Sequence, residues 1–266
     1  MKCKVIELSG KASKHVELPE VFSSQLRPDL VKRAYWIVNS HSIQPYGRDP
    51  MAGERTSARS WQTGRGVARV PRVKGERHPR SGQAAGVASV VKGRLPHPPK
   101  AEKVIYRKIN EKERKLALAS AIAFTADAES VGSRGHRLSK TEPPVVVTDD
   151  VESISKTAEV KTFLAKAGLE EELARLYDGV KRLSGKSRMR GRAHRERIGP
   201  LFVVTNDRGL GRAATSIPGV DVVPLDSLSV VHLSPGAVPG RLTLWTESSL
   251  ELLRAREKEV EMKVAA

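Results

Sequence analysis

The fold is decided by two short apolar stretches, Pro144-Val-Val-Val-Thr148 and Leu201-Phe-Val-Val-Thr205. A continuous apolar run of this length predicts a strand that is buried on both faces, as in a parallel sheet covered by helices. Residues 220–223 and 242–245 have the same character, and residues 4–8 are predicted to form a further short strand. Together these runs indicate a sheet of several mostly parallel strands.

Helical patterns lie between these strands. Pro28 is placed to open a helix, and Asn110 with Glu113 has the spacing of a capping box for a second one. A third helix starts at the acidic residues 170–172 and is expected to end at Lys181 and Arg182, the order that the helix dipole favours. A fourth is predicted over residues 246–259. The apolar stripes of the first three are Leu30, Val31, Ala34, Tyr35, Ile37 and Val38; Leu116, Ala119 and Ala123; and Leu169, Leu173, Leu176, Tyr177 and Val180.

Residues 47–100 do not fit this pattern. They contain eight Gly and six Pro and show neither a helical period nor sustained alternation. We therefore expect an α/β fold, with a mostly parallel sheet flanked by helices and built from residues 1–46 and 101–266, into which residues 47–100 are inserted as a long, irregular, extended loop. The loop has little apolar surface to offset the entropy cost of ordering. We expect it to be mobile alone and ordered only against a partner.

The composition of the 266 residues excludes several classes of protein. The longest apolar run, residues 116–124, is itself interrupted by Ser120 and is about half the ~18 residues of a membrane span. No signal peptide is expected at the N-terminus, and no membrane partner. The single cysteine, Cys3, cannot form an internal disulfide or a cysteine-based metal site, which suits a reducing cytosol. We expect a cytoplasmic protein.

The net charge of +17 is concentrated in two blocks. Residues 47–100 hold nine Arg and three Lys against three acidic residues, a net of +9. Residues 181–197 hold eight basic residues against Glu196, a net of +7. Two basic blocks on a nearly neutral body indicate binding of a polyanion. Arginine dominates the first block, and its planar guanidinium pairs with phosphate and stacks on bases, which favours RNA.

Two glycine motifs raise an enzymatic hypothesis. Gly209-Leu-Gly211-Arg-Ala-Ala214 matches the fingerprint of dinucleotide sites, although three residues separate it from the preceding strand; the alternative is a turn that caps a helix. Gly185-Lys186-Ser187 is similar to a phosphate-binding loop, but a helix precedes it instead of a strand. The seven histidines show no metal-ligand spacing and no adjacent nucleophile motif. We expect no catalytic residue, no cofactor and no metal site.

Several longer motifs point to one family. They are Ser60-Trp61-Gln-Thr-Gly64-Arg65-Gly66-Val-Ala-Arg69-Val-Pro71-Arg72-Val, His78-Pro-Arg80-Ser81-Gly82-Gln83, His97-Pro-Pro-Lys100-Ala, residues 110–126, Arg134-Gly135-His136-Arg137 and Gly240-Arg-Leu-Thr-Leu-Trp245-Thr-Glu247-Ser248. In this order they resemble the archaeal and eukaryotic branch of the ribosomal protein L-four family of the large subunit. The resemblance runs from about residue 35 to 260. Because the chain ends soon after the Trp245 helix, we expect an archaeal type without the long C-terminal extension of eukaryotic members.

The resemblance implies a globular α/β domain on the solvent side of the large ribosomal subunit. It implies a loop that threads rRNA to the wall of the nascent-peptide exit tunnel, with residues 64–74 at the far end. The implied partners are large-subunit rRNA, neighbouring ribosomal proteins and the nascent peptide, with no stable homo-oligomer and no catalysis. Two alternatives stay open: a regulator that binds its own messenger RNA, and a dinucleotide-binding enzyme that uses residues 209–214.

The predicted rRNA-binding residues come from the two basic blocks and from residues 134–137. Trp61 is expected to stack on a base or enter an rRNA groove; the alternative is a small local hydrophobic anchor. Gly64 and Gly66 would let the backbone approach RNA closely. Residues 188–197 would form a second contact, or else a solvated basic turn. The full set is Arg48, Arg55, Arg59, Trp61, Gly64, Arg65, Gly66, Arg69, Arg72, Lys74, Arg77, His78, Arg80, Lys92, Arg94, Lys100, Arg134, His136, Arg137, Lys186, Arg188, Arg190, Arg192, Arg195 and Arg197.

Overall fold

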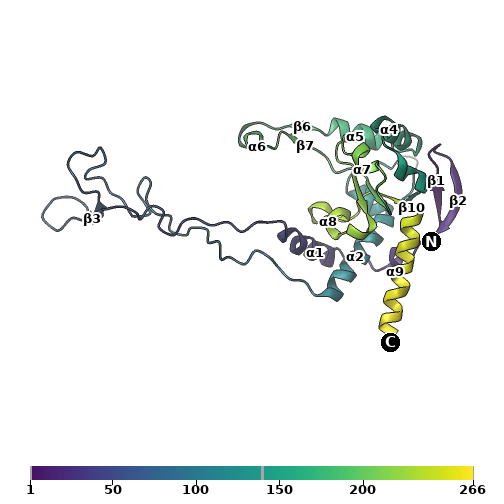
Figure 1. Ribbon diagram of the computed structural model, residues 1–266, viewed down its shortest axis with the longest axis horizontal. Coiled ribbons are helices and arrows are strands. Elements are labelled where there is room, and N and C mark those ends of the chain that lie inside the picture. Colours follow the sequence, from purple (N-terminus) through teal and green to yellow (C-terminus); the bar gives the residue numbers. More distant parts are fainter. Residues whose placement is uncertain (1, 139–140, 266) are drawn as a thin grey trace. The chain divides into compact units, whose positions relative to one another are not determined.

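A computed structural model describes residues 2–138 and 141–265, with side chains described up to residue 257. At its centre lies a six-stranded sheet in the order β2-β1-β5-β10-β8-β9 (Figure 1). All neighbouring strands are parallel except β1 with β2. This confirms the predicted α/β fold. The strands are β1 (Lys2–Ile6), β2 (Ala12–Glu17), β5 (Val145–Val147), β8 (Leu201–Val204), β9 (Asp221–Pro224) and β10 (Thr243–Thr246).

The three central strands are buried on both faces, which explains their unbroken apolar sequences. Every residue of β5, β8 and β10 is buried. In β8, Phe202 and Val204 belong to one hydrophobic cluster, whereas Leu201 and Val203 belong to another. Because successive side chains of a strand point to opposite faces, the two clusters lie on the two sides of the sheet.

Helices cover both sides of the sheet (Figure 1). Those whose residues belong to the first cluster are α3 (Ala128–Ser133), η2 (Asp149–Ser153), α4 (Thr157–Lys166), α5 (Glu170–Asp178) and α7 (Leu210–Ala214). The helices whose residues belong to the second cluster are η1 (Glu20–Ser23), α1 (Pro28–Ser40), α2 (Glu111–Ala126), η3 (Leu225–Ser227), α8 (Val230–Leu233) and α9 (Glu247–Ala265). A further short helix, η4 (Pro235–Ala237), follows α8.

Trp245 is fully buried in the second cluster and meets Phe22 edge-on at 5.3 Å between ring centroids.

The structure corrects the expected features of α2. The helix begins after Asn110, but the Asn110 side chain makes no capping hydrogen bond. Glu113 instead forms an ion pair with Arg33 of α1 at 3.1 Å, so the predicted capping box is absent. The predicted stripe is correct only in part: Ala123 is buried, but Leu116 is 61% exposed and the core face begins at Ala117.

The bounds of α5 and β1 differ from the prediction, and one strand, β2, is not predicted. α5 ends at Asp178, and Lys181 and Arg182 form a separate short strand, β6 (Lys181–Arg182). β1 lies two residues earlier than residues 4–8, because a turn closed by the Gly10 N–H and the Glu7 carbonyl at 2.8 Å occupies the end of that stretch. The sequence does not predict β2, because this strand lies at the edge of the sheet and its residues are almost all exposed, so it lacks the apolar run of the central strands.

The chain divides into two compact units. Met1–Asn39 and Lys108–Ala266 form the first, which holds the sheet, and Ser40–Arg107 form the second. Among the helices of the described residues, none combines the length and the apolar character that a membrane span requires.

The Ser40–Arg107 unit is an irregular hairpin with two long arms (Figure 1). Near its base the Arg48 N–H donates to the Pro99 carbonyl at 2.9 Å. Farther out, Gly53 has φ +87°, and a Cβ there would lie 2.5 Å from the backbone of Gly93, so only glycine allows the arms to approach this closely. Two very short strands, β3 (Arg59–Ser60) and β4 (Pro71–Arg72), pair antiparallel beyond that point.

The base of this unit is closed by ring stacking. The rings of His41 and Tyr106 are parallel within 11°, with centroids 4.0 Å apart. His41 Nε2 also lies 2.8 Å from the carbonyl oxygen of Arg107. Ala85 is the buried hydrophobic residue in the described part of the unit. The two arms are therefore joined by local contacts and not by a hydrophobic core.

Trypsin should cut residues 47–100 of the free protein well before the α4 sites Lys161 and Lys166, because exposed arginines without a core offer little resistance to local opening. Addition of RNA, the partner that the basic composition predicts, should protect the loop sites. Fragment masses followed over time, with and without RNA, measure both effects. Equal resistance of loop and α4 sites without RNA would show that the loop is ordered by itself.

Candidate nucleic-acid interface

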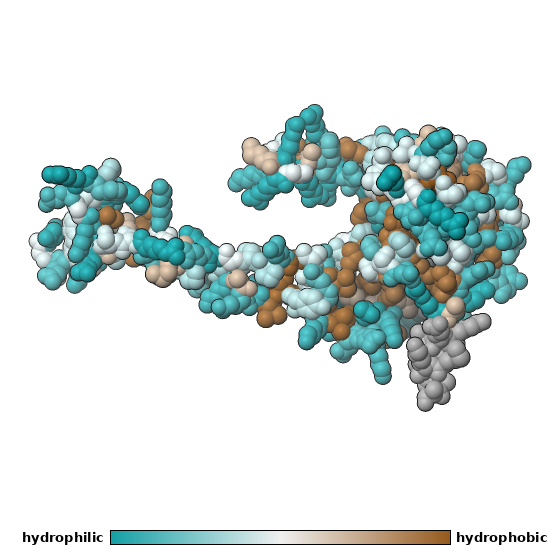
Figure 2. Space-filling model, viewed as in Figure 1, coloured by the Kyte–Doolittle hydropathy of each residue, from teal (hydrophilic) through white to brown (hydrophobic). Residues whose placement is uncertain are grey.

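The basic side chains of the Ser40–Arg107 unit point mostly into solvent, and Figure 2 shows the unit as largely hydrophilic. Ion pairs in its described part join Arg55 to Asp49 at 2.5 Å and Arg94 to Glu54 at 3.8 Å, so few of the guanidiniums are neutralised. Of the predicted residues here, Trp61, Arg72 and Arg80 are half-buried, and the exposed ones are Arg48, Arg55, Arg59, Gly64, Arg65, Gly66, Arg69, Lys74, Arg77, His78, Lys92, Arg94 and Lys100.

Trp61 is the centre of a small local cluster. The guanidinium carbon of Arg65 lies 5.0 Å from its ring centroid and that of Arg72 lies 5.4 Å from it, both within the range of a cation–π contact. Arg72 also donates from Nη1 to the Gly82 carbonyl at 2.9 Å. The geometry is that of the local anchor, and base stacking by Trp61 stays a prediction.

The second basic block forms a hairpin on the sheet-containing unit (Figure 1). β6 pairs antiparallel with β7 (His194–Arg195), and α6 (Gly185–Met189) lies between them. Lys181 stands opposite Arg195, and like charges in opposing positions destabilise a strand pair. A bound anion would remove this repulsion. The predicted residues of the block are all exposed: Lys186, Arg188, Arg190, Arg192, Arg195 and Arg197.

The predicted contact at residues 134–137 is only partly available. Arg137 is exposed, and Arg134 is half-buried with Nη2 donating to the Pro235 carbonyl at 2.6 Å. Burial, together with the charge of Arg241, lowers the pKa of Arg134 to about 10. His136 is 6% exposed and its Nδ1 lies 2.6 Å from Glu172 Oε1. The predicted RNA contact of His136 is therefore wrong, because the side chain is enclosed in the protein.

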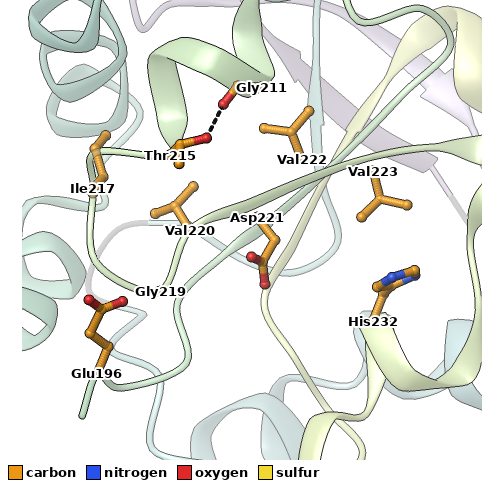
Figure 3. Close-up of a pocket in the computed structure, with 10 residues that line it drawn as sticks. All are labelled: Glu196, Gly211, Thr215, Ile217, Gly219, Val220, Asp221, Val222, Val223 and His232. Atoms are coloured by element: carbon orange, nitrogen blue, oxygen red, sulfur yellow. Dashed lines mark hydrogen bonds between the residues drawn. The ribbon is translucent and has the colours of Figure 1, made fainter. Parts of the chain in front are cut away.

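The fingerprint at residues 209–214 does not form a dinucleotide site. α7 is only five residues long, and the carboxylate of Asp207 accepts the N–H groups of Gly209 and Gly211 at 3.0 and 2.9 Å. A pyrophosphate would need these donors. The cavity of about 550 Å³ beside this turn is lined by the carboxylates of Glu196 and Asp221 and, among the described residues, by no lysine or arginine (Figure 3). The helix-capping alternative fits these contacts.

Gly185-Lys186-Ser187 belongs to the basic hairpin, where α6 follows the two-residue strand β6. This short exposed turn lacks the long preceding strand of a phosphate-binding loop. Within the described ranges, no group of three His, Cys, Asp or Glu side chains could hold a metal ion.

Comparison with known proteins gives a consistent result. The model of the ribosomal protein L4/L1 family matches residues 16–256. The chain belongs to this family. It is 44% identical over 253 residues to the large ribosomal subunit protein uL4 of Methanosphaera stadtmanae, which covers 95% of this chain and 96% of that protein. It is 45% identical over 256 residues to uL4 of Methanothrix thermoacetophila, with 96% and 100% covered. Both organisms are archaea, which confirms the predicted branch.

In this member of the L4/L1 family, a buried ionic cluster supports the hairpin. Arg175 of α5 donates to Glu172 Oε1 at 2.5 Å and to the carbonyl of Ile198, where the hairpin ends, at 2.7 Å. Glu172 Oε2 also accepts the Arg137 N–H at 3.0 Å. Glu172 thus connects α5 to residues 136–137, and Arg175 connects α5 to the end of the hairpin.

The electrostatics of the cluster follow from burial and hydrogen bonding. Burial by itself would raise the pKa of Glu172, but hydrogen bonds from His136, Arg175 and the Arg137 backbone lower it from 4.5 to about 2. Burial lowers the pKa of His136, against the opposing effect of Glu172. The cluster therefore holds a carboxylate, a guanidinium and a neutral imidazole at neutral pH.

Sequence reasoning does not identify Glu172 and Arg175 as a buried ion pair, because the helix dipole alone accounts for acidic residues at the start of α5. One signal was present. Glu172 lies between Leu169 and Leu176 at spacings of three and four, so it shares their buried face. A glutamate on an apolar face with an arginine three residues later indicates a buried ion pair.

Glu172→Gln should destabilise the protein by about 3–5 kcal/mol at neutral pH, because Arg175 is left as an unpaired buried charge. Since the pKa of Glu172 is lower in the folded state, its contribution is present above about pH 4.5 and is lost as the pH falls toward about 2. The variant should lose less stability over that interval. Urea unfolding at several pH values measures this.

Glu171→Gln, at an exposed position of the same helix, is the matched control and should change the free energy of unfolding by less than about 0.5 kcal/mol. Equal effects of the two substitutions would contradict the assigned role of Glu172.

Proposed function

We propose that the chain is a structural component of the large ribosomal subunit that binds large-subunit rRNA and has no enzymatic activity of its own. The L4/L1 family match and the names of its archaeal relatives support the assignment. The observation that carries rRNA binding is the set of exposed guanidiniums with few carboxylate partners in the Ser40–Arg107 unit. Phosphates are the natural partners of such groups, and this activity belongs in the cytoplasmic ribosome.

The contact surface that we assign comprises the two arginine-rich elements and Arg137. Residues 47–100 would clamp rRNA helices, and residues 181–197 would form a second contact on the sheet-containing unit. His136 is left out because it is buried. We keep Arg134 as a residue that positions the neighbouring Arg137, since its guanidinium is bonded to the carbonyl of Pro235.

We further propose that the turn between β3 and β4 reaches the wall of the nascent-peptide exit tunnel. Half of the 54 residues of 47–100, extended at about 3.3 Å each, spans roughly 90 Å, which is enough to cross a layer of rRNA. Gly64 and Gly66 lie in this turn with positive φ, and no atom lies within 4 Å of a Cβ built on either. The nascent peptide and neighbouring ribosomal proteins would be the other partners.

A regulator that binds its own messenger RNA is the second candidate function, since the same exposed arginines would serve it. Competition decides between the two. If large-subunit rRNA fragments displace the messenger RNA at equal concentration, the messenger RNA contact is secondary to the ribosomal one.

Affinity for rRNA fragments should fall by about 10³-fold or more between about 50 and 200 mM salt, because each phosphate contact releases counterions. Replacing Arg188, Arg190 and Arg192 by Gln should reduce the slope of log affinity against log salt by about 2 to 3. Filter binding over a salt series measures the slope.

The matched control is Lys156, Lys161 and Lys166 replaced by Gln, which removes the same charge from the exposed surface around α4. It should leave the slope nearly unchanged. If both triple variants reduce the slope equally, the hairpin is not a specific part of the interface.

Deletion within the tip should leave the sheet-containing unit folded. For this test we shorten the proposed tip from residues 64–74 to residues 64–68, because residues 71–73 bond to residues 82–85. Deletion of residues 64–68 avoids these bonds and should allow at least partial incorporation into large subunits. Tunnel access for small molecules, measured by chemical footprinting, should change. A Gly-Ser replacement of the same five residues is the control for length. Normal incorporation with unchanged access would contradict the tip assignment.

A further inference from the structure

An open groove lies between α2, α9, η1 and η3, and none of the described residues that line it is a predicted rRNA-binding residue. Its volume is about 990 Å³. Its apolar lining comes from all four elements and their flanks: Val21, Leu118, Ala119, Ile122, Leu225, Leu228 and Leu253. Of these, Leu225, Ile122 and Leu253 are buried and form the floor, whereas the others are partly exposed.

The sequence of α2 indicates that this groove is covered in the assembled state. Residues 116–124 form the longest mainly apolar stretch of the chain, interrupted by Ser120, and α2 is apolar on more than one side. One side, with Ala117 and Ala121, is buried in the core. A second side faces the groove, with Leu118, Ala119 and Ile122 at spacings of one and three. A helix with two apolar sides is normally covered on both of them.

The charges around the groove disfavour RNA as its occupant. Its two basic residues are already paired, Arg256 with Asp226 and Lys115 with Glu111. Glu257 accepts the N–H groups of Glu20 and Val21 at 3.3 and 2.8 Å, and the exposed Glu20 carboxylate has no ion pair among the described residues. On a chain of net charge +17, this rim carries an excess of carboxylates, which repels phosphate and attracts cations.

We propose that the groove is a docking site for an amphipathic, basic segment of a neighbouring large-subunit protein. Apolar side chains of the segment would enter the floor beside Ala119 and Ile122, and its lysines or arginines would meet Glu20 and Glu257. Helices that lie in grooves between helices bind in this way. A second copy of this chain is disfavoured by its own charge of +17. The inference rests on the proposed function.

A photoreactive residue at position 228, in the wall of the groove, tests the occupant in assembled large subunits. The cross-linked product is digested and identified by mass spectrometry. A protein segment with alternating apolar and basic residues is expected. Position 116 is the control, since it lies on α2 and is 61% exposed but does not line the groove. It should give no cross-link to that segment.

Ala119→Arg, combined with the residue at position 228, tests the groove itself. The introduced arginine side chain should occupy the groove and lower the cross-link yield by about tenfold or more. Ala119→Ser is the matched control and should keep the yield. Glu20→Lys reverses the charge of an exposed rim residue without altering the core, and it should also lower the yield. Circular dichroism of each free variant verifies folding.

The outcomes separate this inference from the proposed function. If the chain does not enter large subunits, the proposed function fails. If it enters them and position 228 cross-links to rRNA, to a second copy or to nothing, the docking site is overturned while the function stands. An unchanged yield in both Ala119→Arg and Glu20→Lys would also overturn it.

Discussion

Burial of the sheet on both faces is the constraint on which the rest of the molecule depends. Successive residues of β8 belong to opposite hydrophobic clusters, so Phe202 and Val203 are equally excluded from solvent. Neither face of such a strand can present an exposed charged side chain to a binding partner. The excess positive charge is therefore concentrated in segments that leave the sheet, namely the two basic blocks. The separation between a neutral body and basic appendages follows from that restriction.

Buried ionic groups within the sheet-containing unit hold the root of the basic hairpin. Arg175 binds Glu172 and the carbonyl of Ile198. Arg241, only 2% exposed, binds the carbonyls of Gly199 and Gly219 and the carboxylate of Asp221. Two buried guanidiniums thus hold consecutive backbone positions at the point where the basic hairpin rejoins the sheet. Their desolvation is offset by nearly complete hydrogen bonding, and they fix the hairpin root.

The patterns that predicted this molecule correctly were local ones. The strands at residues 144–148 and 201–205 and the helix opened by Pro28 follow from apolar periodicity and backbone chemistry, which act over a few residues. The errors arose where a side chain met a partner far away in sequence. His136 was predicted to face RNA, but it meets Glu172, and Glu113 was predicted to cap its own helix, but it meets Arg33.

By itself the sequence determined the α/β class, the two concentrations of positive charge and the family. These are properties of composition and residue spacing, which can be recognised without knowing any tertiary contact. Tertiary structure alone decided which charged groups are available to a partner, and it alone revealed the groove beside α2. Burial is set by what packs against a residue, and Glu172 and His136 are 36 positions apart. A pattern of a few residues carries no information on such a pair, because only the folded chain brings its members together.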